Sequence, residues 1–214
     1  MLKSQWLKSP WLLAGIALLV AFVALGLYSQ TIHESLIPRL YDSASTIRRS
    51  MYGKYIFVGI MGLIPGLSGL VMIWIAFLSP RWSDRFLWSA AMIFTGVELG
   101  LDANQVFTRA GWAGTTHTYP SPYAVTGLLA YSSWLLIIDR SAMQLWKKRV
   151  LGTLCILALL GVLTYPLINS WVNPIDIAGS VLFAASCFCF GVFVATRIGV
   201  NLFQHDEQSE SQLE

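Results

Sequence analysis

The sequence predicts an all-α, polytopic membrane protein with six transmembrane helices and an interfacial amphipathic helix between the first and the second. Of its 214 residues, 56% are hydrophobic and only 12% are charged, and the mean hydropathy is +0.62. A soluble domain carries about 25% charged residues. Most of the nine tryptophans fall near the ends of apolar runs, the depth at which aromatic side chains meet lipid headgroups. We expect one membrane domain over residues 1–204 and an acidic, disordered tail over residues 205–214.

The first predicted span covers residues 11–28, which is long enough to cross a membrane. Lys3 and Lys8 precede it, as in a signal peptide. Apolar residues continue where a cleavage site would fall, so we expect this span to be retained. In residues 31–54, apolar residues recur at helical spacing with charged residues between them. This pattern predicts an amphipathic helix in the plane of the interface, with a solvated loop as the alternative.

The remaining spans are predicted at residues 55–78, 86–107, 123–138, 150–167 and 176–198. Pro65 lies inside the second span and is expected to kink it. Basic turns are predicted at residues 79–85 and 139–149. With the N-terminus inside, more lysines and arginines lie on the inner side than on the outer side. This bias predicts two cytoplasmic termini, and we expect the membrane to be the bacterial cytoplasmic one.

Several classes of function have little support in the composition. The net charge is only +3 and basic runs are short, so no nucleic-acid partner is predicted. All three cysteines lie inside apolar runs, where small packing residues are the expected role. His33, His117 and His205 are scattered along the chain. We therefore predict no metal site and no cofactor.

The most polar stretch at the edge of an apolar run covers residues 98–123. Glu98 lies about 12 residues into the third span, roughly 18 Å along it, and Asp102 follows one turn later on the same face. An ionisable group at this depth costs at least ~2.5 kcal/mol and normally faces the bundle interior. Arg109 continues the row and is suited to bidentate binding of a phosphate. The alternatives are an internal polar cluster for the acids and an interfacial anchor for Arg109.

The order of these features resembles the type 2 phosphatidic acid phosphatase (PAP2) family. Its members have six spans, an interfacial helix after the first, and a site on the outer face. Their motifs are K-x6-R-P, P-S-G-H and S-R-x5-H-x3-D. Asp102 and Arg109 keep the spacing of the first motif, Pro120 and Ser121 match the start of the second, and Asp176 matches the end of the third.

The departures from these motifs fall on the residues that the family's reaction needs. Val172 stands where the nucleophilic histidine belongs, and Tyr123 replaces the histidine that acts as general acid. Valine is no nucleophile, and tyrosine, with a pKa of about 10, is a poor acid near neutral pH. Asp102 replaces the phosphate-binding lysine, and its repulsion of a phosphate ~4 Å away is roughly 4 kcal/mol at an effective dielectric of ~20. The resemblance therefore implies a degenerate member that is not an active phosphatase.

Together these observations predict an outward-facing polar pocket that binds a membrane lipid or a phosphate-bearing amphiphile without hydrolysis. Arg109, Ser121 and His117 would hold an anionic group and the acids a cation, so a zwitterionic headgroup would satisfy both. The alternatives are a phosphatase or phosphotransferase with altered residues, a proton- or ion-coupled transporter using Glu98 and Asp102, and an assembly partner of another membrane protein. The predicted ligand-binding residues are Glu98, Asp102, Arg109, His117, Ser121, Tyr123 and Asp176.

Overall fold

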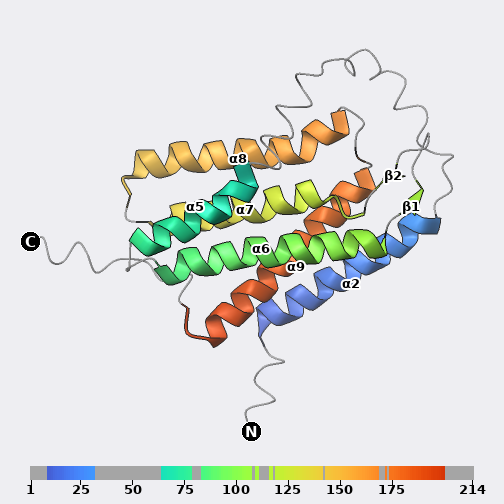
Figure 1. The fold of residues 1–214 in the computed structure, drawn as a ribbon, viewed down its shortest axis with the longest axis horizontal. Helices are drawn as coiled ribbons and strands as arrows, with labels where there is room; N and C mark the ends of the chain where they lie inside the picture. The colour runs from blue at the N-terminus through green and yellow to red at the C-terminus, as the bar shows by residue number, and fades with distance from the viewer. Residues whose placement is uncertain are drawn as a thin grey trace, which may run out of the picture.

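The computed structural model describes residues 9–31, 64–78, 83–107, 109–110, 116–117, 119–141, 143–168, 172 and 174–200. These residues form helices and one short hairpin (Figure 1). The helices are α2 (Pro10–Thr31), α5 (Ile64–Leu78), α6 (Ser83–Val106), α7 (Pro122–Arg140), α8 (Leu145–Ile168) and α9 (Pro174–Arg197). The hairpin pairs β1 (Arg109–Ala110) with β2 (Thr116–His117) in antiparallel register.

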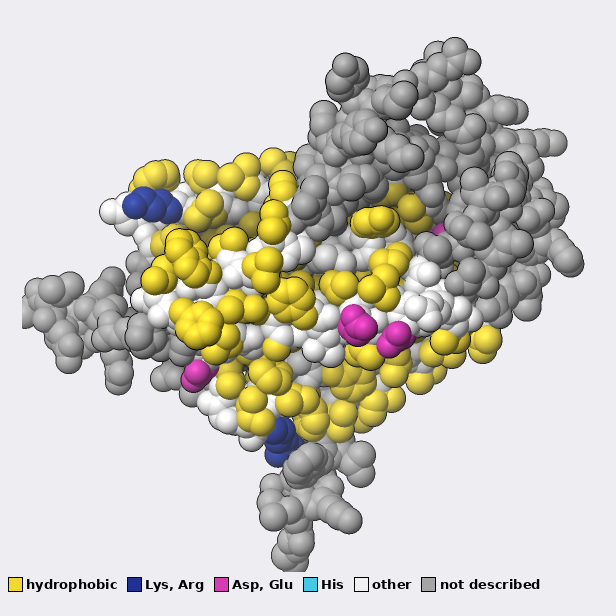
Figure 2. All heavy atoms as spheres, viewed as in Figure 1, with side chains coloured by type: hydrophobic (Ala, Val, Ile, Leu, Met, Phe, Trp, Pro, Cys, Tyr) yellow, Lys and Arg dark blue, Asp and Glu magenta, His cyan; other side chains and the backbone are white. Residues whose placement is uncertain are grey.

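Three of the described helices are long and apolar enough to cross a membrane. Their spanning segments are Pro10–Ser29 in α2, Asp84–Val106 in α6 and Pro174–Arg197 in α9, and α5 is a shorter apolar helix. Large hydrophobic side chains are exposed on the outside of all six helices, and they cover much of the face shown in Figure 2. An apolar surface of this extent is typical of a protein that contacts lipid. An all-helical membrane protein is therefore supported, and the number of six spans stays a prediction.

The boundary of α8 corrects one prediction. We expected a basic turn up to residue 149, but the helix begins at Leu145 and includes Lys147 and Lys148. Lysine and arginine favour helix formation, and the Lys148 amine donates a hydrogen bond to the carbonyl of Asp139 at 3.0 Å, near the end of α7. The predicted interfacial helix, the start of the second span and the C-terminal tail lie outside the described residues, and so does any kink before Pro65.

The central helix of the bundle is α7, which contacts α5, α6, α8 and α9. In Figure 1 it runs between α8 and α6, α9 crosses behind α6 at an angle, and α2 lies on the far side of α6. Val125, Leu129 and Ala130 of α7 are all buried. The first helix, α2, packs along α9, where the Ser186 hydroxyl donates a hydrogen bond to the carbonyl of Gly15 at 3.0 Å. This arrangement joins the two ends of the described chain.

Two glycines of α6 determine which side of that helix faces inward. A Cβ atom added at Gly96 would clash with the side chain of Leu129, and one at Gly100 would lie 3.4 Å from Val125. Small residues four positions apart allow two helices to approach closely. The glycine face of α6 therefore packs against α7, and the residues on the opposite side of α6 point out of the bundle.

Candidate functional site

The ring of Tyr119 lies where α2, α6 and α9 meet, and it is completely buried. Its hydroxyl donates a hydrogen bond to the carbonyl of Phe22 at 2.6 Å. The ring stacks on Phe22 with centroids 5.1 Å apart, and it meets the Phe107 ring edge-on at 5.4 Å. Gly26 and Gly179 leave room for it, because a Cβ atom at either position would overlap the ring. Tyr119 is thus enclosed by three helices.

The two residues after Tyr119 are also bonded to neighbouring helices. The side-chain amide of Asn104 in α6 donates to the carbonyl of Pro120 at 2.9 Å. The backbone N–H of Ser121 donates to the hydroxyl oxygen of Ser180 in α9 at 2.9 Å. That hydroxyl in turn donates to the carbonyl of Asp176 at 2.6 Å. We call residues 119–121 with these partners the Tyr119 junction, since they tie the start of α7 to α2, α6 and α9.

The β1–β2 hairpin leads into this junction and places two predicted site residues opposite each other. Arg109 and His117 are paired across the strands. Because His117 is two residues before Tyr119, the hairpin lies next to the junction along the chain.

Ser121 and Asp176 are brought together, but inside the protein. Ser121 is 4% exposed and Asp176 is 0% exposed, and Ser180 bridges the two segments. We expected both residues to face an outward-facing pocket. In this structure neither side chain is accessible to a headgroup outside the bundle, because both lie where α7 and α9 pack against each other.

Glu98 and Asp102 are exposed on the outside of α6, so the expectation that they face the bundle interior is wrong. The physical reason is the glycine face of α6: Gly96 and Gly100 pack inward, and the acids lie on the other side of the helix. Acidic side chains do interrupt the hydrophobic surface of the face shown in Figure 2. Tyr123 is also exposed, at 53%. Of the predicted residues whose side chains are described, three are therefore exposed and two are buried, so these five do not share one pocket.

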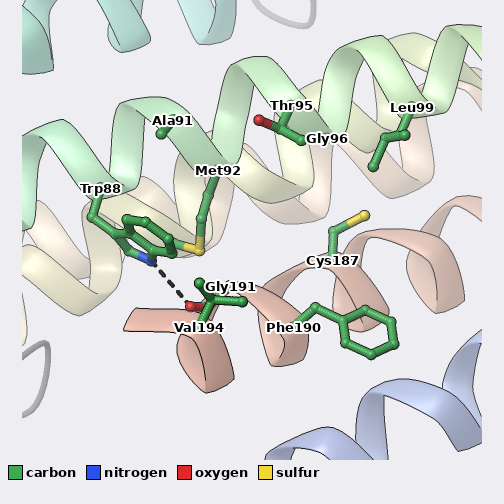
Figure 3. A pocket seen from close by; sticks show the side chains of 10 residues that line it. All are labelled: Trp88, Ala91, Met92, Thr95, Gly96, Leu99, Cys187, Phe190, Gly191 and Val194. Carbon is green, nitrogen blue, oxygen red and sulfur yellow. Dashed lines mark hydrogen bonds between the residues drawn. The ribbon is translucent and has the colours of Figure 1, made fainter. Parts of the chain in front are cut away.

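Sequence reasoning missed a groove of about 240 Å³ between α6 and α9. Figure 3 shows Trp88 and Met92 of α6 directed toward α9, where the indole N–H of Trp88 donates to the carbonyl of Gly191 at 3.1 Å. The side chain of Met92 packs against Gly191 itself. Almost all of the lining is apolar, and it includes Ala91, Thr95, Leu99, Phe190 and Val194. The sequence signal was the small residues Ala91 and Thr95, which leave space between the two helices.

The position of the family's nucleophile is occupied by a packing residue. Val172 is half-buried and packs against the cluster that includes Ala124, Val162 and Ile177. Within the described ranges, no three histidine, cysteine, aspartate or glutamate side chains lie close enough to hold a metal ion. The described side chains thus offer hydrogen-bond donors, carboxylates and apolar surface, which are the elements of a binding site.

No protein-family model, curated protein or solved structure matches this chain. The resemblance to the PAP2 family therefore stays a prediction, carried by Asp102, Arg109, Pro120, Ser121 and Asp176.

Proposed function

We propose that this protein is a six-span membrane protein with a degenerate PAP2-like architecture that binds a phosphate-bearing amphiphile at its outer end without hydrolysing it. The observation that carries the proposal is the register of the hairpin, which pairs Arg109 with His117. An arginine and a histidine side by side supply several N–H donors, and the guanidinium binds a phosphate bidentately.

The Tyr119 junction supports this proposal because it holds the hairpin on a rigid base. Its hydrogen bonds reach three helices, through Phe22, Asn104 and Ser180. A binding site held in place before its ligand arrives loses less conformational entropy on binding. The amphiphile's phosphate therefore meets a site that is already positioned.

The acids of α6 favour a ligand that also carries a positive charge. Glu98 and Asp102 are four residues apart, hence on one face of the helix, and both are exposed. Asp102 lies between Glu98 and the hairpin along the chain. A zwitterionic headgroup meets both requirements, with its phosphate on Arg109 and His117 and its ammonium group beside the carboxylates.

We propose that the bound phosphate ester is not hydrolysed, because three residues at the motif positions lack the chemistry or the placement that the reaction needs. Val172 has no nucleophilic atom and packs in an apolar cluster. Ser121 is buried, and Tyr123 is exposed at the start of α7. Release of inorganic phosphate from phosphatidic acid, lost on Asp102→Asn or Asp176→Asn, would instead favour the phosphatase or phosphotransferase with altered residues.

The orientation that we propose places both termini in the cytoplasm of a bacterium. Arg85 lies in the first turn of α6, Arg140 ends α7, Lys147 and Lys148 begin α8, and Arg197 ends α9. If these helices span the membrane in alternating directions, the four sites lie at one end of the bundle. Cytoplasmic ends carry an excess of such residues.

The two non-lipid alternatives receive less support. Glu98 and Asp102 lie on the outside of α6, whereas an ion path through the protein needs them between helices. For the assembly partner, we expected Pro65 and the small-residue faces of the second and sixth spans to form the interface, and the sixth span lacks an open face of this kind at two of its glycines. Gly179 and Gly191 of α9 are instead covered by Tyr119 and Met92 of this chain.

The test is retention of phosphatidylethanolamine by the purified full-length chain, measured by native mass spectrometry after release from lipid nanodiscs. We expect Arg109→Ala to lower retention about tenfold, the size of a lost charge-assisted bidentate contact. The matched control is Arg149→Ala, an exposed arginine near the start of α8, which should retain lipid like the wild type. Equal retention by both variants would contradict the proposal.

A further inference from the structure

We propose that the groove between α6 and α9 holds one acyl chain of a lipid whose ammonium group is bound by Glu98 and Asp102. The inference deepens the proposed function, and rests on it for the phosphate end of the ligand only. The acyl chain lies on a surface that none of the predicted headgroup residues line. The ligand class is an amine-bearing amphiphile.

The groove lies on helices that can cross the membrane and has the length of one leaflet. Both α6 and α9 contain spanning segments. Along α6 the lining runs from Trp88 to Leu99, a distance of roughly 16 Å at 1.5 Å per residue. The hydrocarbon core of a bilayer is about 30 Å thick, so the length of the groove matches the thickness of one leaflet.

The volume and the lining favour a hydrocarbon chain over a partner helix. The groove encloses about 240 Å³, whereas one turn of helix with its side chains occupies on the order of 500 Å³. The indole N–H of Trp88, which lies at one end of the lining, is already bonded to the carbonyl of Gly191. The groove therefore presents apolar surface to its occupant, and an acyl chain needs no hydrogen bond in return.

Charge complementarity identifies the other end of the ligand. Glu98 follows Thr95 by three positions and Asp102 follows Leu99 by three, so the acids neighbour the groove on the surface of α6. Asp102 is four residues, or about 6 Å, from the end of α6, and Glu98 is about 12 Å from it. These depths run from the headgroup level into the hydrocarbon, where an exposed carboxylate is costly unless a cation is paired with it.

The probe is hexadecylamine, which has a chain and an ammonium group but no phosphate. Its binding to the full-length chain in dodecyl maltoside is measured by native mass spectrometry. Ala91→Trp fills the groove from an exposed position, and we expect it to lower occupancy about tenfold, with Thr95→Trp as a second variant. Asp102→Asn should lower it roughly threefold, as for loss of one exposed charge contact. The matched control is Ala17→Trp, an exposed alanine of α2, which should bind like the wild type.

Equal binding by the Ala91→Trp and Ala17→Trp proteins, at unchanged thermal stability, would overturn the inference. So would a disulfide between two copies of an Ala91→Cys variant at full lipid loading, because a second copy would then cover the groove. Binding of a lysine-bearing transmembrane peptide in place of the amine would overturn it as well.

Arg109→Ala separates this inference from the proposed function. Because hexadecylamine carries no phosphate, its binding should be unchanged by this substitution. Arg109→Ala could leave phosphatidylethanolamine retention unchanged while Ala91→Trp still lowers the binding of hexadecylamine. In that case the proposed function fails and the groove inference stands. If Arg109→Ala lowers phosphatidylethanolamine retention while Ala91→Trp binds hexadecylamine like the wild type, the proposed function stands and the groove inference fails.

Discussion

The hydroxyl of Tyr119 donates a hydrogen bond to the carbonyl of Phe22 at 2.6 Å, joining residues that are 97 positions apart. This contact ties the segment before α7 to the middle of α2. The same ring is stacked on Phe22 and lies against Gly26 and Gly179. One side chain therefore links the first helix of the bundle to the last.

Removing only the Tyr119 hydroxyl tests this link. Tyr119→Phe should lower the free energy of unfolding by about 1 kcal/mol, since it keeps the ring and deletes one buried hydrogen bond. Tyr119→Ala should cost about 3–5 kcal/mol, because it leaves a cavity. Thermal unfolding in detergent measures both. The control Tyr123→Phe changes an exposed tyrosine. If this control lowers the free energy of unfolding as much as Tyr119→Phe does, the hydrogen bond to Phe22 does not stabilise the protein.

The closeness of Tyr119 to α9 makes a second prediction. Gly179→Ala should destabilise the protein by about 1–3 kcal/mol, because the added methyl group overlaps a ring that is enclosed on all sides. Gly161→Ala is the matched control in α8, where the added Cβ atom meets nothing within 4 Å. There we expect a gain of about 0.5–1 kcal/mol from helix propensity. Equal unfolding temperatures for the two variants would contradict the packing described here.

The bond between α7 and α9 is tested through its side-chain partner. Ser180→Ala removes the acceptor of the buried Ser121 N–H, which should cost about 1–3 kcal/mol. Because the junction positions the hairpin, this variant should also retain less phosphatidylethanolamine. Thr164→Ala serves as the control, since that hydroxyl is exposed and bonds only to its own helix. A Ser180→Ala protein with wild-type stability and retention would argue against the junction.

The proposed orientation is tested by labelling single cysteines in a background that lacks Cys155, Cys187 and Cys189. Cysteine introduced as Thr116→Cys, in β2, should react in intact cells with a thiol reagent that cannot cross membranes. Gln144→Cys, just before α8, should react only after the cells are opened. Labelling of both positions from the same side would contradict alternating spans across α7.

The helices were predictable because an apolar run is a local property of the chain. The described parts of α2, α6, α7 and α9 agree with the predicted spans within a few residues. The start of α8 was not predictable in this way, because Lys147 and Lys148 belong to a basic segment that predicts a turn, whereas the helix already begins at Leu145. Charge marks the membrane boundary, but a helix can continue beyond it.

The candidate site was less predictable because its residues depend on how the helices are rotated. Spacing in the sequence placed Glu98 and Asp102 together on one face of α6, and that relationship holds. It did not determine which face lies inside. Two carboxylates in a span predict an interior position. Gly96 and Gly100 pack against α7 instead, so Glu98 and Asp102 lie on the outside of α6.

Sequence patterns alone predict a helical membrane protein, the approximate extent of most of its described helices and the polar stretch at the end of the third predicted span. Apolar run lengths and the period of the helix carry that information without reference to neighbours. Packing between helices, by contrast, places Gly96 and Gly100 against α7, buries Ser121 and Asp176, and leaves a groove between α6 and α9. Close packing selects the face with the least bulk for the interior, so the acids of α6 lie outside, next to a groove that sequence spacing does not reveal.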